Sequence, residues 1–234
     1  SGENMTDYFG VWINADNVTV RGFTIQGCNL SALYILSNHT TITDTILSYN
    51  RAYGILLGST DPSPAPEMSG FHTITNNLII HNTAGIWISG QNNIIRGNVI
   101  SYNDIGIIVL LAMNNNISHN RISQNTNGVL LAGSYKTVIY RNNITKNDKG
   151  VYTMWTSADR ILQNNFIDNN KSASAAQGIL FLMIYRLKGE IPFPIRRNVW
   201  NQNYWDGPRL LPYKSPGVLM FFIDWHPAQE PYDI

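Results

Sequence analysis

The sequence predicts an all-β fold, a right-handed parallel β-helix (β-solenoid) of about 7–8 coils with about 22 residues in each coil. Two observations predict it. The first is a small residue followed by a mostly apolar triplet, which recurs mainly at intervals of 21 or 22 residues. Its positions are Gly10, Ala32, Gly54, Gly85, Gly106, Gly128, Gly150 and Gly178. The second is asparagine, which recurs in the same register.

The asparagines form two columns. The first lies three residues before the repeat glycine at Asn82, Asn103, Asn125 and Asn147, and is extended by Asn29, Asn50, Asn169 and Asn203. The second lies five residues earlier in each coil, at Asn77, Asn98, Asn120, Asn142, Asn164 and Asn198. An amide both donates and accepts hydrogen bonds, and asparagine tolerates the left-handed backbone of tight turns. We therefore expect Asn ladders that satisfy the backbone groups of buried turns.

Short segments of alternating β-branched residues lie between these markers and predict about three strands in each coil. A leucine-rich repeat has a similar period, but its leucine spacing is absent. We expect the β-helix to span residues 1–205, with insertions near 58–71 and 171–177 and a longer loop at 184–196. Residues 206–234 are expected to form an aromatic C-terminal tail or cap.

The composition excludes several classes of protein. Charged residues make up only 13% of the chain and the net charge is +1, so we expect no nucleic-acid partner. No apolar run is long enough for a membrane span and no signal segment is recognised, so we expect no membrane insertion. The single cysteine, Cys28, excludes an internal disulfide and is expected to be a small buried side chain.

Glycosylation sequons favour a location outside the cytoplasm, extracellular or at the cell surface. They occur at Asn4, Asn17, Asn29, Asn38, Asn116, Asn143 and Asn170. Because the chain is rich in Asn, Ser and Thr, such triplets also arise by chance, and glycosylation stays open at this point.

The repeat resembles the NosD-like β-helix family of prokaryotic periplasmic and surface proteins over about residues 10–205. The phrases that carry the resemblance begin at Asn14 (NADNVTVRGFTI) and Asn92 (NNIIRGNVI), with an aromatic closing segment at Asn203 (NYWDGP) and a further one at Asp224 (DWHP). The broader class is the carbohydrate-binding and sugar-hydrolase (CASH) β-helix domain. The resemblance implies a periplasmic or secreted protein with a polysaccharide or surface role, and copper delivery as one specialised case.

The register brings no catalytic or metal-binding cluster together. No two acids share a position in adjacent coils, and Asp148 with Asp168 is the best available pair for general acid and base. Arg96 and Arg141 stand in different columns. No histidine stacks on another; the five are His39, His72, His81, His119 and His226. We therefore expect no catalytic residues, no metal and no cofactor.

One outward column of the glycine-anchored strand is apolar instead of polar. It reads Trp12, Tyr34, Leu56, Trp87, Ile108, Leu130, Tyr152 and Leu180. A contiguous apolar face usually has a partner. The tail segment around residues 218–223, a second copy of the protein and a sugar chain are the three alternatives.

Our leading hypothesis is a non-enzymatic extracellular building block, a homo-oligomer or polymer that assembles into a surface layer, sheath or filament through this face. Binding or processing a polysaccharide is the alternative. A periplasmic copper-handling role comes last.

Overall fold

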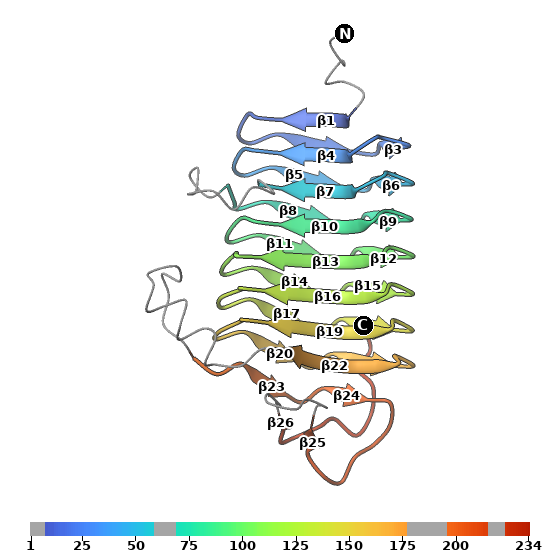
Figure 1. Cartoon of the computed structure of the whole chain (residues 1–234), viewed down its shortest axis with the longest axis vertical. Coiled ribbons are helices and arrows are strands. Elements are labelled where there is room, and N and C mark those ends of the chain that lie inside the picture. Colours follow the sequence, from blue (N-terminus) through green and yellow to red (C-terminus); the bar gives the residue numbers. More distant parts are fainter. Residues whose placement is uncertain (1–7, 59–68, 177–195, 215–222) are drawn as a thin grey trace.

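A computed structural model describes residues 8–58, 69–176, 196–214 and 223–234. Within these residues the chain forms strands β1 to β26 and no helix, so none of them provides a helix able to cross a membrane. The strands wind into a right-handed parallel β-helix whose coils stack along one long axis (Figure 1). The predicted fold class is confirmed, including the coil length of about 22 residues.

Each coil contributes one strand to each of three sheets, here named A, B and C. Sheet A contains β1 (Phe9–Ile13), β4 (Ser31–Ile35), β7 (Tyr53–Leu57), β10 (Ala84–Ile88), β13 (Ile105–Leu110), β16 (Asn127–Ala132), β19 (Lys149–Met154) and β22 (Lys171–Ala176). Sheet B contains β2 (Thr19–Arg21), β5 (Thr41–Thr43), β8 (Thr73–Thr75), β11 (Ile94–Arg96), β14 (Asn116–Ser118), β17 (Val138–Tyr140), β20 (Arg160–Leu162), β23 (Val199–Asn201), β26 (Ile223–Asp224) and β25 (Tyr213–Lys214). Sheet C contains β3 (Thr24–Gln26), β6 (Ile46–Ser48), β9 (Leu78–Ile80), β12 (Val99–Ser101), β15 (Arg121–Ser123), β18 (Asn143–Thr145), β21 (Asn165–Ile167) and β24 (Tyr204–Trp205).

The core is a stack of branched aliphatic side chains. In sheets B and C the middle residue of each three-residue strand points inward, as Ile95 and Ile100 do, while its two neighbours point out. In-register parallel pairing places identical positions above one another, so Ile95 lies between Ile74 and Ile117. The interior is therefore apolar along its length, and burial of these columns drives folding.

Each coil turns three times, and nearly every turn places a residue with left-handed backbone just before a buried polar side chain. The B–C turn shows this in four successive coils: Asn76, Gly97, His119 and Arg141 have φ between 50° and 68°, and each is followed by a buried asparagine. This conformation exposes the backbone N–H of the next residue to the coil below.

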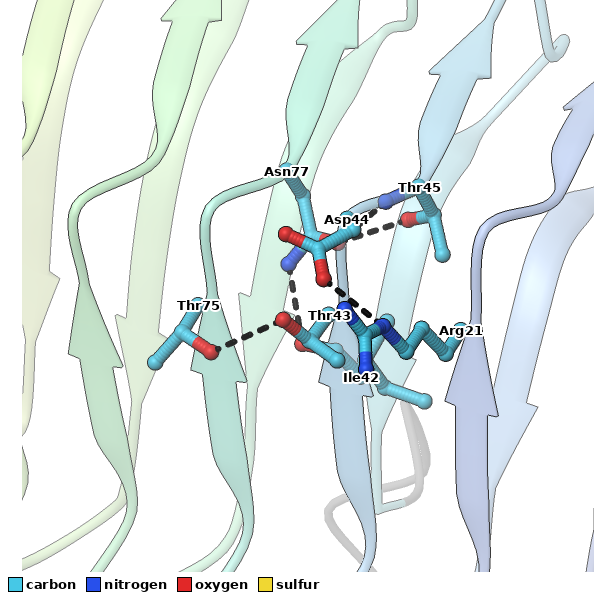
Figure 2. A network of polar contacts seen from close by, with 7 residues as sticks. All are labelled: Arg21, Ile42, Thr43, Asp44, Thr45, Thr75 and Asn77. Carbon is cyan, nitrogen blue, oxygen red and sulfur yellow. Dashed lines mark hydrogen bonds and ion pairs between the residues drawn. The ribbon is translucent and has the colours of Figure 1, made fainter.

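Buried amides join the coils in three ladders. At the B–C turn, Asn98 donates through Nδ2 to Asn120 Oδ1 (3.0 Å), and Asn120 donates to Asn142 Oδ1 (2.9 Å). Figure 2 shows the start of this ladder, where Thr45 donates to Asn77. The C–A turn carries the predicted ladder Asn82, Asn103, Asn125, Asn147 and Asn169, joined by the same type of bond. The prediction of Asn ladders is confirmed.

Three ladder assignments from the sequence need correction. Asn203 continues the B–C ladder below Asn164 and not the C–A column, because the chain between them is longer than one coil. Asn198 belongs to a third ladder at the A–B turn, where it accepts from the backbone of Asp159. At the C–A turn the ladder position of the second coil is held by half-buried Cys28, whose N–H donates to Asn50, and not by Asn29.

The third ladder was missed because its residues vary. It runs through His72, Asn93 and Asn115 in the upper coils and through Thr137, Asp159 and Asn198 in the lower ones. Burial lowers the pKa of His72 to about 4 and raises the pKa of Asp159 to about 7. Asp159 also accepts from Ser134 Oγ at 2.6 Å. Two titratable groups therefore occupy buried positions that elsewhere hold a neutral amide.

The repeat glycine is required by close approach of the next coil. A Cβ added at Gly85 would lie 2.6 Å from the carbonyl oxygen of Gly106, and one at Gly54 would lie 2.7 Å from that of Gly85. Real Cβ atoms do not come this close to backbone oxygen, so a side chain would push the coils apart. This explains why the glycine column marks the period so clearly in the sequence.

The tail caps its own rod at the C-terminal end. Trp205 stacks on Phe166 at 4.5 Å and on Tyr213 at 3.8 Å, so the apolar interior ends in a pile of rings. The buried Asp224 accepts from the backbone of Asn203 and from Trp205 Nε1, which ends the B–C ladder. The chain then returns along sheet C, where Tyr232 exchanges hydrogen bonds with Asn165.

One predicted insertion is wrong. Residues 171–177 were expected outside the coil, yet Lys171–Ala176 form β22, whose Ala173 pairs with Val151 in sheet A. Small alanine and serine side chains hid this strand from a search for large apolar residues. Of the other predicted irregular segments, residues 59–68 and 184–195 lie outside the described part of the chain.

Replacing a central ladder residue is expected to destabilise the fold strongly. Asn120→Ala removes the amide that bonds Asn98, Asn142 and the Ile95 carbonyl, and leaves buried partners unsatisfied. We expect a loss of about 3 kcal/mol or more in the free energy of unfolding, measured by chemical denaturation. Asn116→Ala, an exposed position in the same coil, should change it by less than about 0.5 kcal/mol. A similarly small loss of unfolding free energy in Asn120→Ala and Asn116→Ala would contradict the role of the ladder.

Stability is expected to fall with rising pH because of Asp159. Its folded pKa of about 7 lies above the ordinary value of 3.8 for an aspartate, so the folded state binds the proton more tightly and loses stability as pH rises between these values. The slope is about 1.4 kcal/mol per pH unit. Asp159→Asn should abolish the part of the pH dependence of stability that Asp159 causes.

The measurement is denaturation of both proteins across this pH range. His72 contributes the opposite slope between about pH 4 and its ordinary value of 6.5, and it does so equally in wild type and variant. The difference between the two proteins therefore isolates Asp159. Parallel pH profiles would contradict the assignment.

Candidate functional site

The outward column of sheet A has the register that the sequence predicts. Trp12 pairs with Tyr34, Tyr34 with Leu56, Leu56 with Trp87, and the column continues through Ile108 and Leu130 to Tyr152. The last position differs: Ser174 pairs with Tyr152, whereas the predicted residue, Leu180, lies outside the described residues. The column therefore ends in a small polar side chain.

Most of this column is not freely exposed. Trp12 is 47% exposed, but Leu56 and Ile108 are 3% and 6% exposed, because Leu56 lies between Tyr34 and Trp87 and Ile108 lies beside Trp87. Near the first coils the rings cover one another, with Tyr34 stacked on Phe9 at 4.8 Å. The face is apolar as predicted, but its area available to a partner is smaller than the sequence suggests.

The acids are gathered at the C–A turn of the lower coils. Asp104, Asp148, Asp168 and Asp206 each lie within two residues of a C–A ladder or turn position. Asp148 accepts from Asn170 Nδ2 and Asp206 accepts from the backbone of Asp168, so both carboxylates have structural partners. The pair Asp148 and Asp168 thus lies in a row of turn residues, with no cleft described between them.

The outer side of sheet B carries the opposite charge. From β11 to β23, its outward side chains and the adjoining turns present cations together with amides and a histidine. We name this surface the basic face and define it by Arg96, Asn114, Asn116, His119, Lys136, Arg141, Arg160 and Arg196. Its strands also place Val138 and Tyr140 outward, so the face combines charged, polar and apolar contacts.

An open hollow of about 480 Å³ lies where the basic face meets the A–B turn. We name it the hollow; Lys136, Arg160 and Arg196 line it together with Asn114 and Asn116. The A–B turn creates the space because its left-handed position holds Lys136 in one coil and only Ala158 in the next. Ser157 fixes the next segment by accepting from the Arg196 backbone at 2.6 Å.

A second cluster lies at the other edge of the same strands, at the B–C turn. We name it the corner; it consists of Arg96, His119, Tyr140 and Arg141. The His119 ring meets Tyr140 edge-on at 5.9 Å, and the Arg141 guanidinium lies 5.4 Å from the Tyr140 ring centre. Burial and the two nearby guanidinium groups lower the pKa of His119, so its imidazole is neutral at pH 7.

The cations of the basic face form no ion pair with any acid that the structure describes. In the upper coils Arg21 forms an ion pair with Asp44 at 3.0 Å, visible in Figure 2. Among the described residues no such pair is found for Arg96, Arg141, Arg160 or Arg196. The nearest acid in sequence, Asp159, is buried and points inward, and the tail that carries Glu230 and Asp233 runs along sheet C. The basic face is therefore a local positive region on a nearly neutral chain.

The sequence reasoning missed this face because it used the total charge and a column-by-column search. Arg96 and Arg141 do stand in different columns, yet both lie close enough to His119 to influence its titration. The available signal was the sorting of charges: in the lower coils the acids follow the C–A asparagines, whereas these cations lie beside sheet B.

The predicted sequons occupy different environments. Asn17, Asn29, Asn116 and Asn170 are exposed, and Asn116 faces the hollow. Asn38 and Asn143 are half-buried, and Asn143 donates to the backbone of Ile234. Asn4 lies outside the described residues. Their glycosylation stays a prediction.

Removing one arginine of the corner is expected to raise the pKa of His119. Arg96→Gln deletes a nearby positive charge, which favours the protonated imidazole. The pKa should move towards its ordinary value of about 6.5, as followed by NMR titration of the imidazole. Lys146→Gln, an exposed cation at the C–A turn, is the control and should leave it unchanged. An unmoved His119 in Arg96→Gln would show that the corner does not exist in solution.

Solved structures of low sequence identity share the fold. A complex of XylC with xylose matches with a TM-score of 0.61 and 18% identity over 68% of this chain and 33% of its own. A mutant of the periplasmic alginate epimerase AlgG matches with a TM-score of 0.59 and 17% identity, over 81% of this chain and 43% of its own. Pectate lyase Pel9A matches with a TM-score of 0.51 and 14% identity, over 83% of this chain and 52% of its own. The chain spans a third to about half of these proteins. It has no significant match among curated proteins.

A family model described as periplasmic copper-binding protein (NosD) matches residues 3–209. The described residues do not fit a copper centre, because no three His, Cys, Asp or Glu side chains gather there. His39 stacks on Phe71, and His81 lies between Tyr49 and Tyr102. No chemistry through copper follows from this arrangement. The match covers most of the repeat, and the chain belongs to the NosD family of parallel β-helix proteins.

Proposed function

We propose that this protein binds an anionic polysaccharide, one that carries carboxylates, on the basic face of sheet B. The observation that carries the proposal is the hollow, which Lys136, Arg160 and Arg196 line with no ion pair to an acid in the described part of the chain. Guanidinium groups form charge-assisted, bidentate hydrogen bonds with carboxylates. Asn114 and Asn116 add amide groups that suit sugar hydroxyls.

The length of the basic face supports a polymer as the ligand. Its cations lie on several successive coils, from Arg96 on β11 to Arg196 before β23. A chain of acidic sugars that lies along the rod therefore meets more than one cation. Solved structures with this fold include proteins named for xylose, alginate and pectate, and alginate and pectate are polymers of uronic acids.

The proposal concerns binding and assigns no catalytic group. It also places the protein in the periplasm or outside the cell, in keeping with the family description. Self-assembly through sheet A stays a prediction, and the limited exposure of Leu56 and Ile108 does not favour it. A polysaccharide partner is supported by a defined surface, whereas a second copy of the protein is not.

The test is calorimetric binding of polygalacturonate and polymannuronate, with neutral dextran as the control polymer. The combined change Lys136→Gln and Arg160→Gln should weaken polyuronate binding at least roughly tenfold, because charge-assisted bonds are lost. Raising the salt concentration should weaken wild-type binding, since exposed charges are screened. The matched control, Lys146→Gln, should bind as wild type does.

Three outcomes would contradict the proposal. They are equal binding of dextran, wild-type affinity in the double variant, and absence of binding to either polyuronate. Dextran sulfate distinguishes carboxylate recognition from attraction to any polyanion. We expect it to bind less tightly than polyuronate under the same salt, and tighter binding would overturn the assignment to carboxylates.

A further inference from the structure

The corner is separate from the hollow, yet the same strands carry both. Asn116 and Val138 begin β14 and β17 at the hollow, and Ser118 and Tyr140 end these strands at the corner. At about 3.3 Å per residue, the two ends of such a strand lie roughly 7 Å apart. A sugar polymer that fills the hollow therefore reaches the corner within a short stretch of its own chain.

The two cations of the corner come from the coils on either side of His119. In the B–C turn column the residue one coil above His119 is Gly97, which contributes no side chain of its own, and Arg96 beside it is exposed. One coil below, Arg141 is held by a bond from its Nε to Gln163 Oε1 at 3.1 Å. The imidazole therefore lies between two guanidinium groups.

Aromatic rings border the corner as well. Tyr140 stands against His119 and Arg141, and Tyr232 from the tail lies 5.8 Å from the Arg141 guanidinium. The Tyr232 hydroxyl donates to the Gln202 carbonyl at 2.7 Å, which fixes its ring. Rings of this kind provide apolar contact for the C–H faces of a sugar, while the cations are suited to its carboxylate.

We propose that the corner is a second carboxylate subsite for the same polysaccharide, and that His119 takes up a proton when a uronate occupies it. This inference rests on the proposed function. The charged and titratable groups that face His119 are Arg96 from β11 and Tyr140 and Arg141 from β17 and its turn. No carboxylate contributes to the lowered pKa of His119, and the chain end, where Ile234 accepts from Asn143, lies on the sheet C side of Arg141. A bound uronate therefore brings a negative charge close to the imidazole.

Proton uptake follows from linkage. In the free protein the two guanidinium groups and burial keep His119 neutral near pH 7. A bound carboxylate favours the imidazolium, so binding near pH 6 draws a proton from the buffer. Affinity for the uronate should therefore rise as pH falls from about 7.5 to 6, while the uronate itself stays ionised.

The experiment is titration calorimetry of the full chain with monomeric galacturonate and with a galacturonate tetramer, in two buffers of different ionisation enthalpy. For the tetramer we expect proton uptake near pH 6, and its loss in His119→Gln. Arg141→Gln and Arg96→Gln should each weaken tetramer binding roughly tenfold. They should leave the weaker binding of the monomer, which occupies the hollow, nearly unchanged.

Two variants serve as controls for misfolding. Arg96→Gln changes an exposed side chain, and Lys146→Gln is the matched control at the opposite turn; both should keep the wild-type circular dichroism spectrum. Wild-type tetramer affinity in the corner variants, or proton uptake that persists in His119→Gln, would overturn the second subsite. If the combined change Lys136→Gln and Arg160→Gln still weakened binding, the proposed function would stand without the second subsite. Failure of wild type to bind either ligand would overturn both.

Discussion

The structure depends on the hydrogen bonds of buried amides between successive coils. A three-sided coil must reverse its direction at corners whose backbone groups are removed from water, and each such group needs a partner. The ladder residues provide it: Asn120 accepts from the backbone of Asn98 and donates to the backbone of Ile95. Because each amide reaches the coils on both sides, the ladder fixes the register of the strands as well as their spacing.

Because the register is fixed, the sequence determines which side chains lie together on each surface of the rod. Every outward position becomes a column that runs along the rod, and the charge or size of a column is set by one residue per coil. The outward columns of the three sheets and their turns differ in the side chains that they carry. Sheet A stacks apolar side chains, the C–A turn carries acids together with lysines such as Lys146, and the lower coils of sheet B with its two turns carry cations that form no ion pair with a described acid. A nearly neutral chain therefore presents a locally positive region on one side.

Much of the fold could be predicted from the sequence, because the features that define it repeat. The glycine column marks the place where coils approach most closely, and the asparagine columns mark the turns. Prediction failed where a position tolerates several residues. The A–B ladder alternates among His72, Asn93, Thr137 and Asp159, since His72, Asn93 and Asp159 each accept from a backbone N–H of the preceding coil and threonine fits the same buried position. The strand at Lys171–Ala176 was missed because alanine satisfies its inward positions at the end of the rod.

The candidate site was harder to predict, because it combines residues from different columns. Lys136 and Ala158 come from a turn, Arg160 from a strand and Arg196 from beyond an irregular segment, so no spacing rule links them. Its recognition needed the three-dimensional positions of the charges, and the lack of an ion pair between these cations and any described acid mattered as much as the presence of arginines. His119 looked isolated in the sequence for the same reason, because the two arginines that lower its pKa come from other coils.

The most direct test of this account is a crystal structure of the protein with a uronate oligosaccharide. We predict that the sugar chain lies on the outer side of sheet B, with a carboxylate at Lys136, Arg160 and Arg196. A sugar chain bound instead on the exposed rings, whether at Trp12 and Tyr34 on sheet A or at Tyr49 and Tyr102 on the C–A turn, would contradict it.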